Sequence, residues 1–382
     1  MKLALVTETF PPEVNGVSMT LGRLCDGLVQ RGWDLLVVRP VQEHEEVDDV
    51  PQSKPFEEFI VAGVPLPGYS SLRMGEPAGF SLHRIWKEKR PDVVHIATEG
   101  PLGVAALIAA KLLEIPVAST FHTNFDQYSD HYSVGGAQRA MSAYLRMVHN
   151  YCGCTLAPTR QMAEALASEG YRNTGVLSRG VDTEHFSPEK RDESLRRAWG
   201  IQDGGRAIVY VGRVAKEKNI DLVVRAYQAI LKERPKDRLI LVGGGPELER
   251  LQRKYPDIRY AGMQKGEALA RHYASGDIFL FASVTETFGN VVTEAMASGL
   301  AVCTYDYAAG REYVRPGENG FLADFGDEQA FVSQAVSLSS LGDEELDRIR
   351  RAARKTAEGI SWDSVVESFQ TSLRALVDRN SS

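Results

Sequence analysis

Two carboxylates in one short stretch, Glu286 and Glu294, are the first candidates for chemistry in this chain. They are eight positions apart, so on one helix, at about 100° per residue, they would share nearly the same face. Gly289 argues against a single helix because glycine destabilises a helix interior, whereas Asn290 is a good N-cap. We therefore predict Glu286 on a loop and Glu294 about one turn inside a helix that Gly299 ends.

The start of this predicted helix suits an anion. The N–H groups of Asn290, Val291 and Val292 would point outward at the positive end of the helix dipole. The stretch could then offer one acceptor to a sugar hydroxyl, N–H donors to a phosphate and a second acceptor to a ribose. An ordinary surface loop followed by a capped helix is the alternative.

Two cations and a glycine turn follow strands in the second half. Arg213 and Lys218 are five positions apart across a strand-to-helix turn, where cations oppose the helix dipole unless an anion binds them. A solvent-exposed pair without a ligand is the alternative. The turn 243–246, which includes Gly244, would let a ligand approach the backbone closely.

Two more candidates follow strands in the first half. Gly16 lies in a breaker-rich loop after a strand at 2–7, and His122 follows a strand at 116–120. Ligands of open α/β sheets bind at the carboxyl ends of strands, so Gly16 could approach a phosphate and His122 could bond to a sugar hydroxyl or a phosphate. A plain turn and a helix cap are the alternatives.

The elements that must position these residues alternate between short apolar strands and amphipathic helices in both halves. This pattern predicts an α/β fold with parallel sheets. We expect the segments 41–56 and 64–73 to be irregular and 308–312 to be a loop. Two C-terminal helices should end the chain.

Composition and charge exclude several classes of protein. The chain has 382 residues, of which 43% are apolar and 25% charged, as expected for about two globular domains. The net charge of −7 argues against nucleic acid as the main partner. Four cysteines make no disulfide framework, and Cys152 and Cys154 lack the further ligands of a zinc site. Without a signal-peptide pattern or an apolar run of 18 residues, we expect a cytoplasmic protein.

The predicted helix 137–150 carries Arg139, Tyr144, Arg146 and two methionines. Such a helix could lie on an acidic membrane surface. A packed helix with a solvated polar side is the alternative.

With these residues assembled, the whole chain resembles the retaining glycosyltransferases of family 4. Its most specific motif is Glu-x7-Glu, from Glu286 to Glu294. The supporting motifs are Gly-Arg-Val-Ala-Lys-Glu-Lys (212–218), Gly-Gly-Gly-Pro (243–246), Arg-Gly-Val-Asp (179–182) and Pro-Pro-x-x-Asn-Gly-Val (11–17). Phe-His-Thr-Asn-Phe (121–125) is similar to lipid-directed mannosyl-, glucosyl- and sulfoquinovosyltransferases. The chain departs from many relatives at 308–312, where Ala-Ala-Gly-Arg-Glu replaces Gly-Gly-x-Pro-Glu.

The resemblance implies a GT-B fold, with two Rossmann-like domains facing a cleft. Residues 1–184 would form the acceptor-side domain and 185–360 the nucleotide-sugar-binding domain. The C-terminal helix, within 361–382, would cross back to the first domain.

The resemblance also implies roles for the candidate residues. Arg213 and Lys218 would hold the donor diphosphate, Glu286 the sugar hydroxyls and Glu294 the ribose, while His122 would contact the sugar near the reacting centre. The implied donor-binding residues are Gly16, Arg213, Lys218, Gly244, Glu286, Phe288, Gly289, Asn290, Val291 and Glu294, and the implied catalytic residues are His122, Arg213, Lys218 and Glu286.

The implied reaction is transfer of a hexose, with mannose from GDP-mannose favoured, to a hydroxyl of a lipid or glycan acceptor. A UDP-sugar-dependent transferase, a soluble sugar-phosphate glycosyl synthase and a non-catalytic nucleotide-sugar-binding module are the alternatives. No metal and no other cofactor is expected. The first domain would contact the inner face of the cytoplasmic membrane peripherally.

Overall fold

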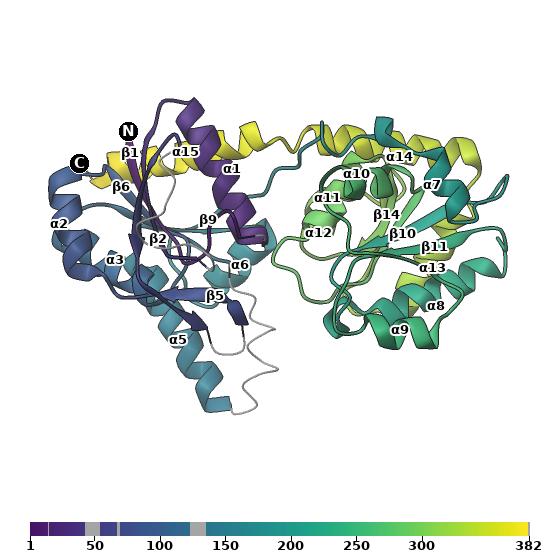
Figure 1. The fold of residues 1–382 in the computed structure, drawn as a ribbon, viewed down its shortest axis with the longest axis horizontal. Helices are drawn as coiled ribbons and strands as arrows, with labels where there is room; N and C mark the ends of the chain where they lie inside the picture. Colours follow the sequence, from purple (N-terminus) through teal and green to yellow (C-terminus); the bar gives the residue numbers. More distant parts are fainter. Residues whose placement is uncertain (14, 43–53, 67–68, 123–134, 381–382) are drawn as a thin grey trace. The chain divides into compact units, whose positions relative to one another are not determined.

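The computed structural model describes residues 1–13, 15–42, 54–66, 69–122 and 135–380. Most of the segment 41–56 and the motif residues 123–125 lie outside this described part. The chain forms two compact units: unit 1 is Met1–Arg179 with Trp362–Ser382, and unit 2 is Gly180–Ser361. Each unit holds a parallel sheet with helices packed against it (Figure 1). The predicted α/β fold class is therefore confirmed.

The main sheet of unit 1 is parallel throughout, in the order β3-β2-β1-β6-β7-β8-β9. Its inner strands are short apolar runs buried on both faces, which is the usual pattern of parallel sheets. The strands are β1 (Lys2–Val6), β2 (Asp34–Pro40), β3 (Glu57–Val61), β6 (Val93–Ile96), β7 (Val117–Thr120), β8 (Cys154–Ala157) and β9 (Thr174–Val176).

The prediction for the segment 64–73 was wrong. The segment expected to be irregular, 64–73, lies in an antiparallel hairpin of β4 (Gly63–Leu66) and β5 (Tyr69–Gly75). Its prolines and glycines indicated a loop. A two-stranded ribbon has two edges, and an edge strand tolerates proline.

Helices cover both faces of the unit 1 sheet. They are α1 (Gly16–Gln30), α2 (Gly79–Lys89), α3 (Pro101–Leu112), α5 (Gly135–Tyr151), α6 (Arg160–Ser168) and α15 (Trp362–Asn380). Helices α2, α3 and α5 pack on one face, and α1 and α15 pack on the other. The C-terminal helix α15, yellow in Figure 1, lies beside α1, where Gly27 leaves room for Val366. Its buried Phe369 and Leu373 join the same apolar cluster as Leu24.

The sheet of unit 2 is also parallel, in the order β12-β11-β10-β13-β14-β15. Its strands are β10 (Ala207–Val211), β11 (Arg238–Val242), β12 (Arg259–Gly262), β13 (Ile278–Phe281), β14 (Ala301–Tyr305) and β15 (Gly320–Ala323). Its helices are η1 (Pro188–Lys190), α7 (Glu193–Ala198), η2 (Lys216–Lys218), α8 (Ile220–Leu231), α9 (Leu248–Lys254), α10 (Gly266–Ala274), α11 (Asn290–Ala297), α12 (Ala309–Tyr313), α13 (Glu328–Ser339) and α14 (Asp343–Glu358).

The predictions for the segment 308–312 and for the number of C-terminal helices were wrong. The expected loop 308–312 contains most of the one-turn helix α12, which is too short to show a helical repeat. Three helices, α13, α14 and α15, end the described chain where we predicted two. Only the three residues 340–342 separate α13 from α14.

Candidate active site

Three loops of unit 2 meet at the carboxyl edge of its sheet. Strands β10, β13 and β14 are neighbours, and the segments that follow them carry Arg213, Glu286 and Tyr307. Parallel strands end at one edge, so these loops gather where open α/β sheets bind ligands.

The ammonium of Lys218 contacts the carboxylate of Glu286. Lys218 Nζ donates to Glu286 Oε1 at 2.6 Å and to the carbonyl oxygen of Thr285 at 3.1 Å, and lies 3.4 Å from Ser283 Oγ. The two charged side chains are only 16% and 18% exposed. A charge-assisted hydrogen bond thus joins Lys218, the predicted contact of a phosphate, to Glu286, the predicted contact of a sugar.

Arg213 is not part of this pair. Its side chain is 61% exposed, and its guanidinium lies 3.9 Å from Glu217 Oε1. The main chain at this point is fixed, because the hydroxyl of buried Tyr210 donates to the carbonyl oxygen of Arg213 at 2.9 Å. An anchored backbone therefore carries a solvent-facing guanidinium at the sheet edge.

The glycine turn after β11 packs on the Arg213 loop. Val214 N–H donates to the carbonyl oxygen of Gly244 at 2.9 Å, and Glu247 N–H donates to that of Val214 at 3.0 Å. A Cβ at Gly243 would overlap the carbonyl oxygen of Gly212, so only glycine fits there. The glycines of this turn thus let it pack closely on the neighbouring loop, and Gly244 is partly exposed beside it. The predicted approach of a ligand to Gly244 stays a prediction.

The start of α11 differs from the prediction. Gly289, not Asn290, is the N-cap, and it has the left-handed conformation (φ 88°, ψ 57°) that glycine adopts readily. Asn290 is the first helical residue. Val292 N–H donates to the carbonyl oxygen of Gly289 at 3.0 Å. It is therefore already satisfied within the turn, whereas Val291 lies partly exposed at the helix start.

Glu294 lies one turn inside α11, as predicted. Its Oε2 accepts a hydrogen bond from the hydroxyl of Tyr273 at 2.8 Å. Burial raises the pKa of Glu294 to about 7, although this hydrogen bond acts in the opposite direction. The carboxyl group is therefore close to half-ionised at neutral pH.

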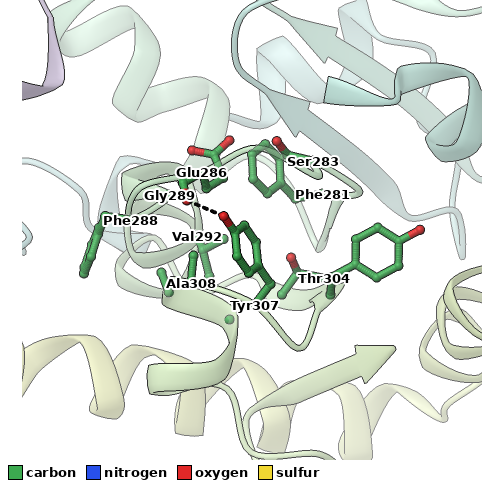
Figure 2. Close-up of a pocket in the computed structure, with 12 residues that line it drawn as sticks. Phe281, Ser283, Glu286, Phe288, Gly289, Val292, Thr304, Tyr307 and Ala308 are labelled. Atoms are coloured by element: carbon green, nitrogen blue, oxygen red, sulfur yellow. Dashed lines mark hydrogen bonds between the residues drawn. The ribbon is translucent and has the colours of Figure 1, made fainter. Parts of the chain in front are cut away.

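A small pocket opens beside Glu286 (Figure 2). Residues that line it include Phe281, Ser283, Glu286, Phe288, Gly289, Val292, Thr304, Tyr307 and Ala308. The hydroxyl of Tyr307 donates to the backbone carbonyl oxygen of Glu286 at 2.8 Å, the dashed line in Figure 2. The ring of Phe288 is buried and packs edge-on against Tyr313. Phe288 therefore supports the wall of the pocket from within the core.

In unit 1, Gly16 was predicted in a loop, but it is the exposed first residue of α1. The side chain of Asn15 caps this helix by accepting the N–H groups of Val17 at 3.1 Å and Ser18 at 2.9 Å. These two donors are thus already satisfied. A Cβ at Gly16 would lie 3.0 Å from Arg179 Nη1. Sequence reasoning assigned Arg179 no role, although its position in a strand-end motif was a usable signal.

His122 follows β7 at the carboxyl edge of the unit 1 sheet. Both of its ring nitrogens are buried, and neither has a hydrogen-bond partner in the described part of the chain. Burial lowers the pKa of His122 well below its usual range, and the charge of Arg179 lowers it further. The imidazole is therefore neutral, with one donor and one acceptor. An unsatisfied buried polar group of this kind is a candidate ligand contact.

The predicted site residues are divided between the units. Gly16 and His122 belong to unit 1, and the other nine belong to unit 2. Within the described ranges, no cluster of three or more His, Cys, Asp or Glu side chains is arranged to hold a metal ion. None of the helices described combines the length and apolar character needed to cross a membrane.

The fold and this edge site define the class of protein. The structure of Anabaena Alr3699/HepE in complex with UDP has the same fold, with a TM-score of 0.76 at 18% identity over 98% of this chain and 100% of that one. Residues 14–185 match the model of Glycosyltransferase Family 4, and residues 205–340 match that of Glycosyl transferases group 1.

Relatives of known name agree with this class. A GDP-mannose-dependent alpha-mannosyltransferase of Mycolicibacterium smegmatis is 34% identical over 100% of this chain and 99% of that protein. An alpha-monoglucosyldiacylglycerol synthase of Streptococcus pneumoniae is 28% identical over 80% of this chain and 71% of that protein. The chain belongs to glycosyltransferase family 4, as its motifs indicated, and is a hexosyltransferase with the GT-B fold.

Proposed function

We propose that this enzyme transfers mannose from GDP-mannose, with retention of configuration, to a hydroxyl of a lipid or glycolipid. The observation that carries the proposal is the Lys218–Glu286 pair at the sheet edge. It holds a cation for a diphosphate beside an acceptor for sugar hydroxyls. The identity to a GDP-mannose-dependent relative over the whole chain favours this donor.

The proposed roles follow from the charges at the edge. Lys218 and the exposed guanidinium of Arg213 would neutralise the diphosphate as negative charge develops on it. Glu286 would accept hydrogen bonds from the sugar, and Glu294 from the ribose. The two cations and the start of α11 would stabilise the diphosphate without a metal. The roles of Gly16 and His122 remain predictions.

The bond changes are those of a same-face substitution. The bond between the anomeric carbon and the diphosphate oxygen breaks, and the acceptor oxygen bonds to that carbon from the same side. The proton of the acceptor hydroxyl passes to the departing phosphate. Lys218 is the group best situated to stabilise that phosphate, since its ammonium already lies at the sugar-binding carboxylate.

A second candidate is transfer of glucose from a UDP-sugar. The similarity to an alpha-monoglucosyldiacylglycerol synthase favours it. Both candidates use a lipid acceptor, so they differ in the donor and share the rest of the reaction. A soluble sugar-phosphate acceptor is the remaining alternative.

Peripheral contact with a membrane fits a lipid acceptor. Ile108 and Leu112 are exposed one turn apart on α3, and Met147 and Tyr151 are exposed one turn apart on α5. The two helices pack on the same face of the unit 1 sheet. We propose that their apolar side chains rest on the inner face of the cytoplasmic membrane.

Thermal unfolding with GDP, UDP, GDP-mannose or UDP-glucose tests the donor. A ligand at about 100 times its Kd adds roughly 2.7 kcal/mol of stability. Stabilisation by GDP and GDP-mannose alone supports the proposal, and stabilisation by the uridine ligands alone supports the second candidate. No stabilisation by any of the four would contradict both. Transfer of labelled sugar to diacylglycerol vesicles, against a soluble sugar phosphate, then tests the acceptor.

A further inference from the structure

The segment after β14 is bonded to the Glu286 loop at two places. The hydroxyl of Tyr307 donates to the carbonyl oxygen of Glu286 at 2.8 Å. The N–H of Ala309 donates to the carbonyl oxygen of Phe288 at 2.8 Å. The two bonds fix the backbone on both sides of Thr287. Neither bond has a part in the roles proposed above for the donor-binding residues.

The backbone at Ala308, between these two donors, is strained. Ala308 has φ 50° and ψ −129°, a conformation that glycine adopts and that alanine adopts at a cost. It is also one of the two positions at which alanine replaces a glycine of the Gly-Gly form of the motif. Strained residues persist where the surrounding structure determines their conformation, and they concentrate at functional sites. Here the strained turn directs Ala309 N–H at Phe288.

The side chain of Tyr307 is itself supported. Its ring packs against that of Phe325, with centroids 4.7 Å apart. Next to it in the chain, the carboxylate of Asp306 accepts two hydrogen bonds from Arg311, at 3.1 and 2.9 Å. A ring and a turn held in this way keep the Tyr307 hydroxyl on one acceptor with little loss of side-chain entropy.

We propose that Tyr307 is a positioning residue, which acts through Glu286 to orient its carboxylate toward the donor sugar. Lys218 holds the side chain of Glu286. Tyr307 holds the main chain of Glu286 (Figure 2). The inference rests on the proposed function, in which Glu286 contacts the sugar. It assigns Tyr307 to recognition of the sugar and not of the nucleotide.

The test compares Tyr307→Phe with a matched control, Tyr260→Phe. Tyr260 also donates to backbone carbonyl oxygens, those of Leu251 at 2.9 Å and Tyr255 at 3.1 Å, but it lies on β12. Both variants lose one partly buried hydroxyl and keep the ring. They should therefore lose similar stability, while only Tyr307→Phe disturbs Glu286.

The quantity to measure is the ratio of the Kd of GDP to that of GDP-mannose, with kcat for transfer. We expect Tyr307→Phe to bind GDP like the wild type, and to lower the ratio and kcat each by about tenfold, the effect of one hydrogen bond. Tyr260→Phe should change neither. If the enzyme prefers uridine ligands, UDP and UDP-glucose replace the guanosine pair.

Three outcomes would overturn the inference, and they are distinguishable. If the wild type binds the sugar donor more tightly than the nucleotide and Tyr307→Phe keeps that difference, Tyr307 does not position Glu286 and the proposed function stands. If the wild type binds GDP-mannose no more tightly than GDP, and UDP-glucose no more tightly than UDP, the proposed sugar site fails. The role of Tyr307 then fails with it. An equal loss in both variants would reduce Tyr307 to a structural residue.

Discussion

Replacing Lys218 by methionine should separate the contribution of its ammonium from that of its apolar stem, because methionine keeps the stem and removes the ammonium. In the wild type the ammonium lies 2.6 Å from Glu286 Oε1, and the two side chains are 16% and 18% exposed. The burial of this ion pair is therefore intermediate. An exposed ion pair is worth about 0–1 kcal/mol, and disrupting a fully buried one costs about 3–5 kcal/mol. We expect the free energy of unfolding to fall by about 1.5–3 kcal/mol.

The effect on turnover should be larger than the effect on folding. Loss of one preorganised group that stabilises developing charge lowers kcat by about 10²–10³-fold. Urea unfolding at pH 7.5 measures the first effect, and transfer of labelled sugar measures the second. Lys216→Met is the matched control, since Lys216 is exposed two positions earlier on the same turn.

A double-mutant cycle with Glu286→Gln completes this test. If the contact is real in solution, the stability losses of Lys218→Met and Glu286→Gln should be non-additive by about 1–2 kcal/mol. Additive losses would show that the two groups do not interact. A Lys218→Met enzyme with the stability and turnover of Lys216→Met would refute the whole argument for a diphosphate-binding cation.

Three further perturbations test other features of the two units. The pKa of Glu294, about 7, lies above its unfolded value of about 4.3, so its contribution to stability is lost as pH rises through 7. A ribose that bonds to the ionised form should make GDP-mannose, whose diphosphate does not titrate in this range, bind more tightly from pH 6 to 8 by calorimetry; in Glu294→Gln this dependence should be absent, and its persistence would exclude Glu294. Phe369→Ala removes a buried ring of α15 and should cost about 3–5 kcal/mol in urea unfolding, whereas a loss under 1 kcal/mol would mean that α15 is weakly packed. Ala308→Gly should raise stability by about 1 kcal/mol through relief of its positive φ, and a decrease would show that the turn is unstrained.

Many strands were predictable from sequence because they are apolar runs bounded by turn residues. The strands predicted at 2–7 and 116–120 are β1 (Lys2–Val6) and β7 (Val117–Thr120). The hairpin β4–β5 was not predictable in the same way. It is stabilised by pairing between segments whose composition alone favours a loop.

The candidate site was predictable as a set of residue types and only partly as an arrangement. Gly289, between the two carboxylates, correctly indicated that Glu286 lies on a loop and Glu294 in a helix. No motif indicated Tyr307, because its bond to the carbonyl oxygen of Glu286 depends on where a distant loop folds back. Arg179 lies in the motif 179–182, but its place beside Gly16 also depends on the tertiary fold.

The sequence by itself determined that strands and helices alternate and that chemically useful side chains follow the strands. These are local properties, set by side-chain periodicity and turn chemistry. Only the tertiary structure decided that Lys218 meets Glu286, which is 68 positions away. It also decided that burial shifts the pKa of Glu294. Strand order and burial arise from contacts between remote segments, and a local pattern does not specify those contacts.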